Sequence, residues 1–227
     1  MAPAPPPPRL YTPPDTPPAI QYADDWIVVA DKPAGLLSVP GRGPDKQDCA
    51  ISRLAPRFGA LHAVHRLDMD TSGLIVFARD QQTGMALSQA FRSRTVTKTY
   101  DAIVEGHPEA ESGEIALPIG RDWNERPLRR IDLETGKPAL THWALIQLVP
   151  GRAWLRLTPV TGRTHQLRLH LAAIGHPIAG DRLYGNETAG NRLCLHANAL
   201  RFLHPVTHAE IAVSSLPAFP ENTPPAK

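Results

Sequence analysis

The sequence predicts an α+β fold, a single domain built on a large, mixed and mostly antiparallel sheet. Segments of strand and helix character follow one another without strict alternation, and no glycine fingerprint of a doubly wound fold is present. The chain has 227 residues, of which 42% are hydrophobic and 20% charged. This length and composition suit a globular protein with one substantial core.

The predicted elements follow from local patterns. Short apolar runs predict buried strands, alternation predicts a half-buried strand, and apolar side chains three or four residues apart predict helices. In chain order these are strands at 26–30 and 74–78, a helix at 81–94, strands at 99–105 and 153–158, and a helix after Gly162 that should end at Gly175. On that last helix His165 and Arg168 are expected to share a face that is not the leucine face, so Arg168 could point into a cleft.

Both ends of the chain are rich in proline. Residues 1–18 contain nine of the 25 prolines, and residues 217–225 contain four more. Proline lacks a backbone donor and blocks helix formation. We therefore expect a disordered arm at 1–18, a catalytic domain at 19–215 and a proline-rich tail at 216–227.

Charge and cysteine content exclude few classes of protein. The formal net charge of +2 permits nucleic-acid binding without demanding it, although arginines and lysines gather in short clusters. Cys49 and Cys194 are far apart and lie in no CxxC motif, so neither a disulfide framework nor a zinc ribbon is indicated. There is no apolar run of the ~20 residues that a membrane helix needs, and no signal peptide. We expect a cytoplasmic protein.

The most informative segment is residues 65–74, HRLDMDTSGL, which leads into the strand at 74–78. Asp68 lies next to Arg66 and just before a Thr-Ser-Gly turn, so a guanidinium and backbone donors could hold its carboxylate ionised. Such a carboxylate is a candidate nucleophile or base. A capped turn with a surface ion pair is the alternative explanation for these residues alone.

The same segment resembles the active-site motif of the RluA-type pseudouridine synthases, in which HRLD and a following TSGL surround the catalytic aspartate. Three further segments resemble the family in the family's order: DKPAGLL at 31–37, KTY at 98–100 and GRTHQLRLH at 162–170. The resemblance extends from about residue 27 to about residue 213. It implies the pseudouridine synthase fold and an isomerase that converts uridine to pseudouridine in RNA.

The resemblance implies roles for three residues: Asp68 as the catalytic carboxylate, Arg168 as its ion-pair partner, and Tyr100 as the ring that lies against the base. The reaction detaches uracil from ribose, turns it and rejoins it through C5, so no cofactor is required. Whether Asp68 attacks the base or the sugar, or first removes a ribose proton, is left open. Arg66, Arg163 and His165 are better candidates for RNA backbone contacts than for bond chemistry.

Segments at 37–42, 122–127 and 134–139 resemble the branch of the family that modifies a hairpin of 23S rRNA and the anticodon stem-loop of some tRNAs. Arg126 would then lie in an insertion that grips a folded RNA loop. The expected partner is RNA, with no membrane and a monomeric chain. Modification of one different rRNA or tRNA uridine is the alternative.

Other classes of function are less well supported. His62, His65 and Asp68 fall at i, i+3 and i+6 and could belong to a metal-dependent hydrolase, with further ligands from His165, His170 and His176. The i+5 spacing of His165 and His170 places them on different sides of a helix, and no second carboxylate completes the set. We therefore expect no metal. An RNA-binding module without catalysis, or an interaction protein working through its proline-rich arm, would leave the combined motifs unexplained.

Overall fold

A computed structural model of the chain describes residues 10–123, 125, 127–185 and 192–219. These residues form two compact units. The first, called here the Asp68 unit, contains residues 11–100 and 196–217, and the second, the Arg168 unit, consists chiefly of residues 101–195. Strand β5 (Thr97–Glu105) begins in the Asp68 unit and ends in the other.

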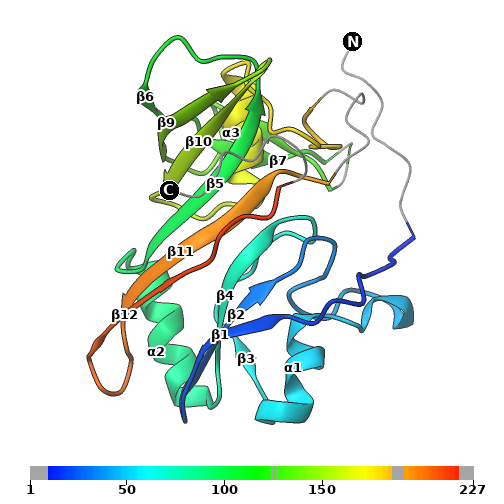
Figure 1. Ribbon diagram of the computed structural model, residues 1–227, viewed down its shortest axis with the longest axis vertical. Helices are drawn as coiled ribbons and strands as arrows, with labels where there is room; N and C mark the ends of the chain where they lie inside the picture. The colour runs from blue at the N-terminus through cyan, green and yellow to red at the C-terminus, as the bar shows by residue number, and fades with distance from the viewer. Residues whose placement is uncertain (1–9, 124, 126, 186–191, 220–227) are drawn as a thin grey trace. The chain divides into compact units, whose positions relative to one another are not determined.

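The Asp68 unit contains a mixed sheet in the order β1-β2-β4-β11, with β12 added to β11 and β3 to β4 (Figure 1). Its strands are β1 (Ala19–Ala23), β2 (Ile27–Lys32), β3 (His62–Ala63), β4 (Ser72–Ala78), β11 (Leu195–Leu203) and β12 (Glu210–Ser214). The pairings are antiparallel except that of β4 with β11, which is parallel. The mixed, mostly antiparallel sheet confirms the predicted fold class.

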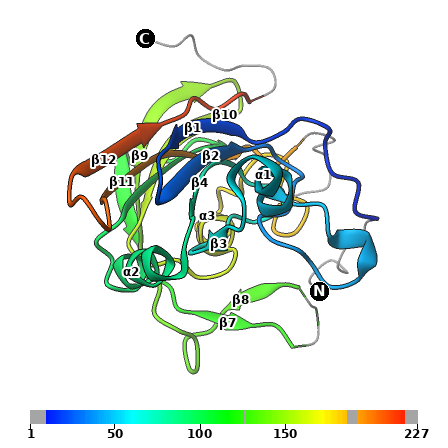
Figure 2. The same ribbon diagram turned by 90° about the horizontal axis from the view of Figure 1, so that it is seen from below.

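Two helices cover opposite faces of this sheet, as Figures 1 and 2 show on either side of β4. They are α1 (Ala50–Phe58) and α2 (Gln81–Arg92), and a short 3₁₀ turn, η1 (Pro44–Lys46), precedes α1. Leu87 of α2 packs on the face of β4 that carries Val76, and Leu54 of α1 belongs to the cluster that contains Phe77. Successive residues of a strand point to opposite faces, which explains why β4 is buried along its whole length.

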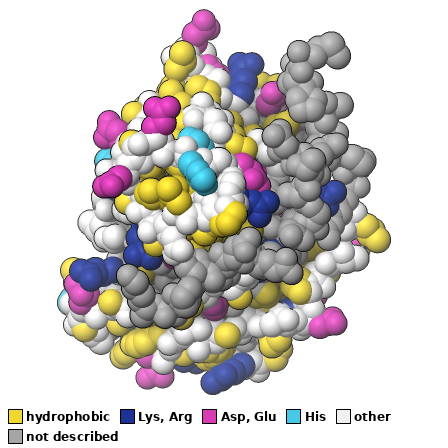
Figure 3. Space-filling view, turned by 45° about the horizontal axis from the view of Figure 1, so that its top comes forward, with side chains coloured by type: hydrophobic (Ala, Val, Ile, Leu, Met, Phe, Trp, Pro, Cys, Tyr) yellow, Lys and Arg dark blue, Asp and Glu magenta, His cyan; other side chains and the backbone are white. Residues whose placement is uncertain are grey.

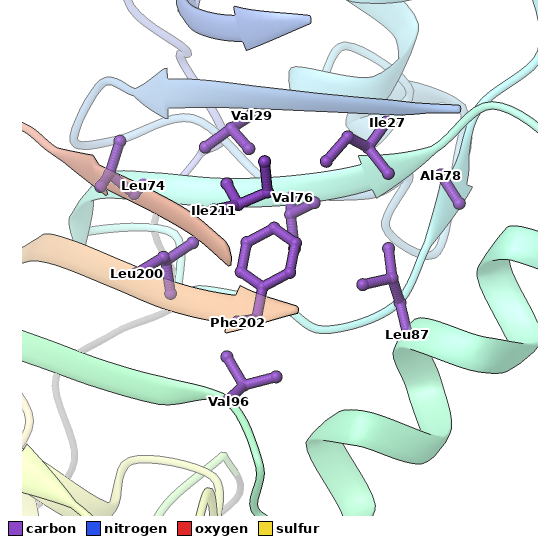
Figure 4. Close-up of a cluster of buried hydrophobic side chains, with 10 residues drawn as sticks. All are labelled: Ile27, Val29, Leu74, Val76, Ala78, Leu87, Val96, Leu200, Phe202 and Ile211. Carbon is purple, nitrogen blue, oxygen red and sulfur yellow. The ribbon is translucent and has the colours of Figure 1, made fainter. Parts of the chain in front are cut away.

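The core on the α2 side is drawn in Figure 4, where Phe202 of β11 lies among side chains of β2, β4, α2 and β12. Burial of a large apolar side chain of this kind contributes about 1.5–3 kcal/mol. The predicted helix at 81–94 is confirmed with an end two residues earlier, at Arg92. Asp80 caps its start by accepting hydrogen bonds from the Thr83 amide (2.8 Å) and hydroxyl (2.6 Å).

The Arg168 unit contains strands in the order β5-β10-β9-β6, a separate two-stranded hairpin and one helix. The elements are β6 (Ser112–Ile115), β7 (Ile119–Arg121), β8 (Arg129–Ile131), β9 (Thr141–Val149), β10 (Arg152–Pro159) and α3 (Gln166–Ala173). The helix begins at Gln166, so the expectation that His165 lies on the helix with Arg168 is wrong. His165 is the N-cap residue in the left-handed region (φ 58°), and the Gln166 side chain closes the preceding turn by accepting from the Arg163 amide (3.0 Å).

The structure also differs from the expected disordered arm. Residues 1–9 lie outside the described residues, but Tyr11, Pro14 and Thr16 hydrogen-bond to Asp48 and Arg53 through a hydroxyl and two backbone carbonyls. Carbonyls in an extended proline-rich segment have no helix or ladder partner, which leaves them available to side-chain donors. Of the predicted tail, residues 220–227 lie outside the described residues.

None of the helices within the described ranges combines the length and apolar character needed to cross a membrane.

Candidate active site

Asp68 lies in the turn that leads into β4, and its side chain is partly exposed. The turn is closed by a hydrogen bond from the Thr71 amide to the Asp68 carbonyl (3.1 Å). Gly73, two residues further, has φ 109°, and a Cβ there would lie 2.4 Å from the Ala197 carbonyl oxygen. Only glycine allows β11 to approach this closely. The glycine of the TSG sequence therefore lets the turn lead directly into the parallel pairing of β4 with β11.

The backbone on both sides of Asp68 is held by the loop that follows β2. Ser38 Oγ donates to the Leu67 carbonyl (2.8 Å) and accepts from the Leu67 amide (3.1 Å). The Met69 carbonyl accepts from the Gly35 amide (2.9 Å) and from Lys32 Nζ (3.0 Å). The two neighbours of Asp68 are therefore fixed by residues some thirty positions earlier, as a preorganised catalytic carboxylate requires.

Lys32 is fully buried, and its ammonium group donates to three backbone carbonyls, those of Pro33 (2.9 Å), Leu36 (2.7 Å) and Met69. Three donors meeting three acceptors satisfy the hydrogen-bonding capacity of a buried cation. Lys32 thus joins the loop after β2 to the Asp68 turn. The motif DKPAGLL marked this segment in the sequence, but the role of its lysine was not predicted.

A hydrogen-bond chain fixes the start of β4 as well. Ser215 donates to the Asp31 carboxylate, so its oxygen accepts from Nε2–H of His196 (3.2 Å). Nδ1 of His196 is then the acceptor for the Ser72 hydroxyl (2.9 Å). Ser72 and His196 are both buried. This chain of hydrogen bonds links the start of β4 to β11 and β2 through side chains.

Tyr100 belongs to the same unit as Asp68 and packs against the α1-side core. Burial raises the pKa of its phenol above the usual value, and the negative charge of Asp68 raises this pKa further. The charge of Asp68 therefore acts on the Tyr100 phenol within one unit. The phenol is protonated at neutral pH and can serve as a hydrogen-bond donor.

His65 has a structural role. Its Nε2 accepts from the Val76 amide (3.0 Å), and its ring stacks on Phe91 with centroids 4.4 Å apart. Burial, together with the smaller effect of the positive charge of Lys98, lowers the pKa of His65 to about 3. The imidazole is therefore neutral at physiological pH, and it fixes the start of the HRLD motif.

In the Arg168 unit, Arg168 is buried and paired with Asp181. The guanidinium donates through Nε (2.8 Å) and Nη2 (2.6 Å) to the two carboxylate oxygens, a bidentate geometry. Asp181 also accepts from the amides of Leu183 (2.9 Å) and Tyr184 (3.1 Å). Asp181 was missed by the sequence analysis because an aspartate 13 positions after Arg168, beyond the end of the helix, gives no local signal.

Tyr184 extends this network. Its ring lies 5.5 Å from the Arg168 guanidinium, and its hydroxyl accepts from the Arg129 amide (2.9 Å) and lies 2.8 Å from His165 Nδ1. The Tyr184 hydroxyl thus joins the β7–β8 hairpin to His165 at the start of α3. Asp68 and Tyr100 belong to one unit and Arg168 to the other, and the proposed pairing of Arg168 with Asp68 stays a prediction.

The remaining predicted RNA contacts are distributed as follows. Arg66 is exposed beside the Asp68 turn. Arg163 is partly exposed and donates to the Pro138 carbonyl (3.1 Å). Arg126 lies outside the described residues.

The side chains of the metal-hydrolase hypothesis have other partners. His65 Nε2 is occupied by the Val76 amide, and His170 contacts Thr141 Oγ1 (3.0 Å) and the Leu117 carbonyl (2.9 Å) through its two nitrogens. Within the part of the chain that the structure describes, no group of three or more potential ligand side chains is placed to hold a metal ion.

Comparison with known proteins decides the family. Residues 26–173 match the model of the RNA pseudouridylate synthase family. This chain belongs to the RNA pseudouridylate synthase family. It is an isomerase that converts uridine to pseudouridine in RNA, as the four motifs predicted.

Relatives of this synthase cover nearly the whole chain. It is 47% identical to the dual-specificity RNA pseudouridine synthase RluA of Pasteurella multocida over 92% of this chain and 98% of the relative, and 44% identical to RluA of Escherichia coli over 86% and 91%. Among solved structures, human RNA pseudouridylate synthase domain containing 1 is similar with a TM-score of 0.73 and 29% identity, covering 92% of this chain and 85% of the other. The synthase fold is therefore shared along the chain.

Proposed function

We propose that Asp68 is the catalytic carboxylate of this synthase and that Tyr100 and Arg168 act with it. The observation that carries the proposal is that hydrogen bonds from β2 and the loop after it hold both neighbours of Asp68, in the unit that also contains Tyr100. The reaction breaks the bond from ribose to N1 of uracil and forms a bond from ribose to C5. C5 then loses its proton, and N1 gains one. The atoms balance within the substrate, so side chains can supply all the groups that the proposal requires.

The proposed substrates are a hairpin of 23S rRNA and the anticodon stem-loop of tRNAs. Support comes from the segments at 37–42, 122–127 and 134–139 and from relatives named dual-specificity synthases. Incubation of the enzyme with transcripts of both RNAs, followed by mapping of pseudouridine, tests this. Modification of one transcript alone would favour the single-target alternative.

We further propose that residues 19–215 form the catalytic domain and that the protein works as a monomer in the cytoplasm. On the face drawn in Figure 3, lysines and arginines are scattered among acidic side chains and do not form one patch. RNA binding on this face would therefore depend on individual contacts and on the shape of the RNA rather than on a broad field.

Trp123 in the loop between β7 and β8 is a candidate RNA contact. Its side chain is 63% exposed, and the Arg121 guanidinium lies 5.4 Å from its ring. An exposed indole beside an arginine is suited to stacking on an unpaired base, which is worth roughly 1–3 kcal/mol. The sequence analysis named this segment but selected Arg126 in it.

We expect Trp123→Ala to weaken RNA binding by roughly 5- to 150-fold, the range that corresponds to loss of one stacked base. Filter binding with a hairpin transcript measures the dissociation constant. Leu133→Ala, which removes another side chain that is 77% exposed in the same unit, is the matched control and should bind normally. Equal affinity of the Trp123 variant and the wild type would remove Trp123 from the interface.

Tyr100→Phe separates the ring from the hydroxyl. We expect RNA binding to survive because the flat ring remains, while single-turnover isomerisation falls by roughly 10²-fold or more if the phenol transfers the C5 proton. Tyr22→Phe, which removes a hydroxyl bonded to Asp24 in the same unit, is the control and should keep the wild-type rate. A wild-type rate for Tyr100→Phe would limit Tyr100 to stacking.

A further inference from the structure

The described part of the proline-rich arm lies against the loop that holds the Asp68 turn. We propose that residues 11–16, called here the strap, position the catalytic aspartate, and that the Tyr11 hydroxyl is the group through which they act. The proposal rests on the catalytic role of Asp68. It makes Tyr11 a positioning residue, since the contacts described below act through the intervening loop.

The strap is anchored to α1 by one arginine. Arg53 donates from Nη1 to the carbonyls of Pro14 (2.7 Å) and Thr16 (3.0 Å). Its Nε and Nη2 form a bidentate pair with Asp48, both at 2.7 Å. One planar guanidinium makes all four bonds. The Asp48 carboxylate therefore orients the guanidinium, and the guanidinium in turn holds the carbonyls of Pro14 and Thr16. This pair lowers the pKa of the Asp48 carboxyl, so the anchor persists at neutral pH.

The strap meets the loop after β2 at two points. The Tyr11 hydroxyl donates to the Asp48 carbonyl (2.8 Å) and accepts from the Leu37 amide (3.0 Å). A Cβ built on Gly35 would lie 3.5 Å from Cδ of Pro14, so the proline ring is close to the loop at that residue. Burial raises the pKa of the Tyr11 phenol, which therefore keeps its proton and its donor role at neutral pH.

Each contact point adjoins a residue that holds the Asp68 turn. Ser38, next to Leu37, forms both hydrogen bonds to Leu67. Gly35 itself donates to the Met69 carbonyl. The strap therefore supports the loop where the loop fixes the two neighbours of Asp68. A displacement of about 1 Å in a catalytic group can cost roughly 10²-fold in rate, so loosening this support should reduce turnover.

Tyr11→Phe removes the bridging hydroxyl and keeps the ring. We expect the single-turnover rate and kcat to fall roughly tenfold with KM for the RNA hairpin little changed, because the strap acts on the chemical step. Hydrogen exchange at the amides of residues 35, 37 and 67, which donate the hydrogen bonds described above, should become faster. Arg53→Met should give the same pattern, and Tyr22→Phe should leave rate and exchange at their wild-type values.

All variants are assayed below their unfolding temperatures, as monitored by circular dichroism. A wild-type single-turnover rate for both Tyr11→Phe and Arg53→Met would overturn the proposal, as would a change confined to KM, which would place the strap on the RNA. An active Asp68→Asn enzyme would instead overturn the proposed function. The two failures are therefore distinguishable.

Discussion

Asp68→Asn is expected to abolish pseudouridine formation. The change keeps the size of the side chain but removes the carboxylate that the proposed mechanism uses, and loss of an essential catalytic group lowers kcat by a factor on the order of 10⁴ or more. Asp68 is partly exposed and its neighbours are held through backbone atoms, so folding should change by less than about 1 kcal/mol. Release of tritium from C5-labelled uridine in a hairpin transcript measures the loss.

Asp70→Asn is the matched control, because this second carboxylate lies in the same turn and is also partly exposed. It should retain activity within a few fold of the wild type. If both variants are equally impaired, the turn needs negative charge in general rather than a specific carboxylate. An Asp68→Asn enzyme that turns over at the wild-type rate would remove Asp68 from the reaction.

The strands and helices that could be predicted are those whose signal is local. The buried strand at 26–30, found at Ile27–Lys32, begins with a short run of apolar residues that is typical of a buried strand. The helix at 81–92 combines a capping aspartate with helical spacing of Leu87 and Phe91. Helix α1 was not predicted, since it contains Pro56 and only two of its residues are fully buried.

The candidate site was predicted as a set of motifs, but the contacts that hold it were not. Ser38 and Leu67 are 29 positions apart, and Lys32 and Met69 are 37 apart. Such pairings depend on how the sheet brings two loops together, and the identity of the paired residues does not predict them.

The strap was missed for a different reason. Proline content predicts an extended segment. Whether that segment binds to the folded part of the chain depends on hydrogen-bond donors far away in the sequence, here the Arg53 guanidinium.

Arg168→Met should destabilise the protein by about 3–5 kcal/mol. The side chains of Arg168 and Asp181 are 4% and 0% exposed, and their closest contact is 2.6 Å. Removal of the cation leaves a buried carboxylate that has lost its bidentate partner, which costs more than the pair itself contributes. Urea unfolding of Arg168→Met and of Asp181→Asn measures both losses. Unchanged stability in both variants would show that water reaches the pair.

A double variant separates folding from catalysis. Replacing both charges, as in Arg168→Met with Asp181→Leu, removes the buried unpaired charge and should recover part of the lost stability. If Arg168 also assists Asp68 in the reaction, this folded double variant stays inactive. In that case, the acid limb of the pH profile of any turnover left in Arg168→Met moves to higher pH, because loss of the cation favours the protonated carboxyl. Recovery of activity together with stability would mean that Arg168 serves only to build the unit around Asp181. The double variant therefore distinguishes a partner of the catalytic aspartate from a structural arginine within one fold.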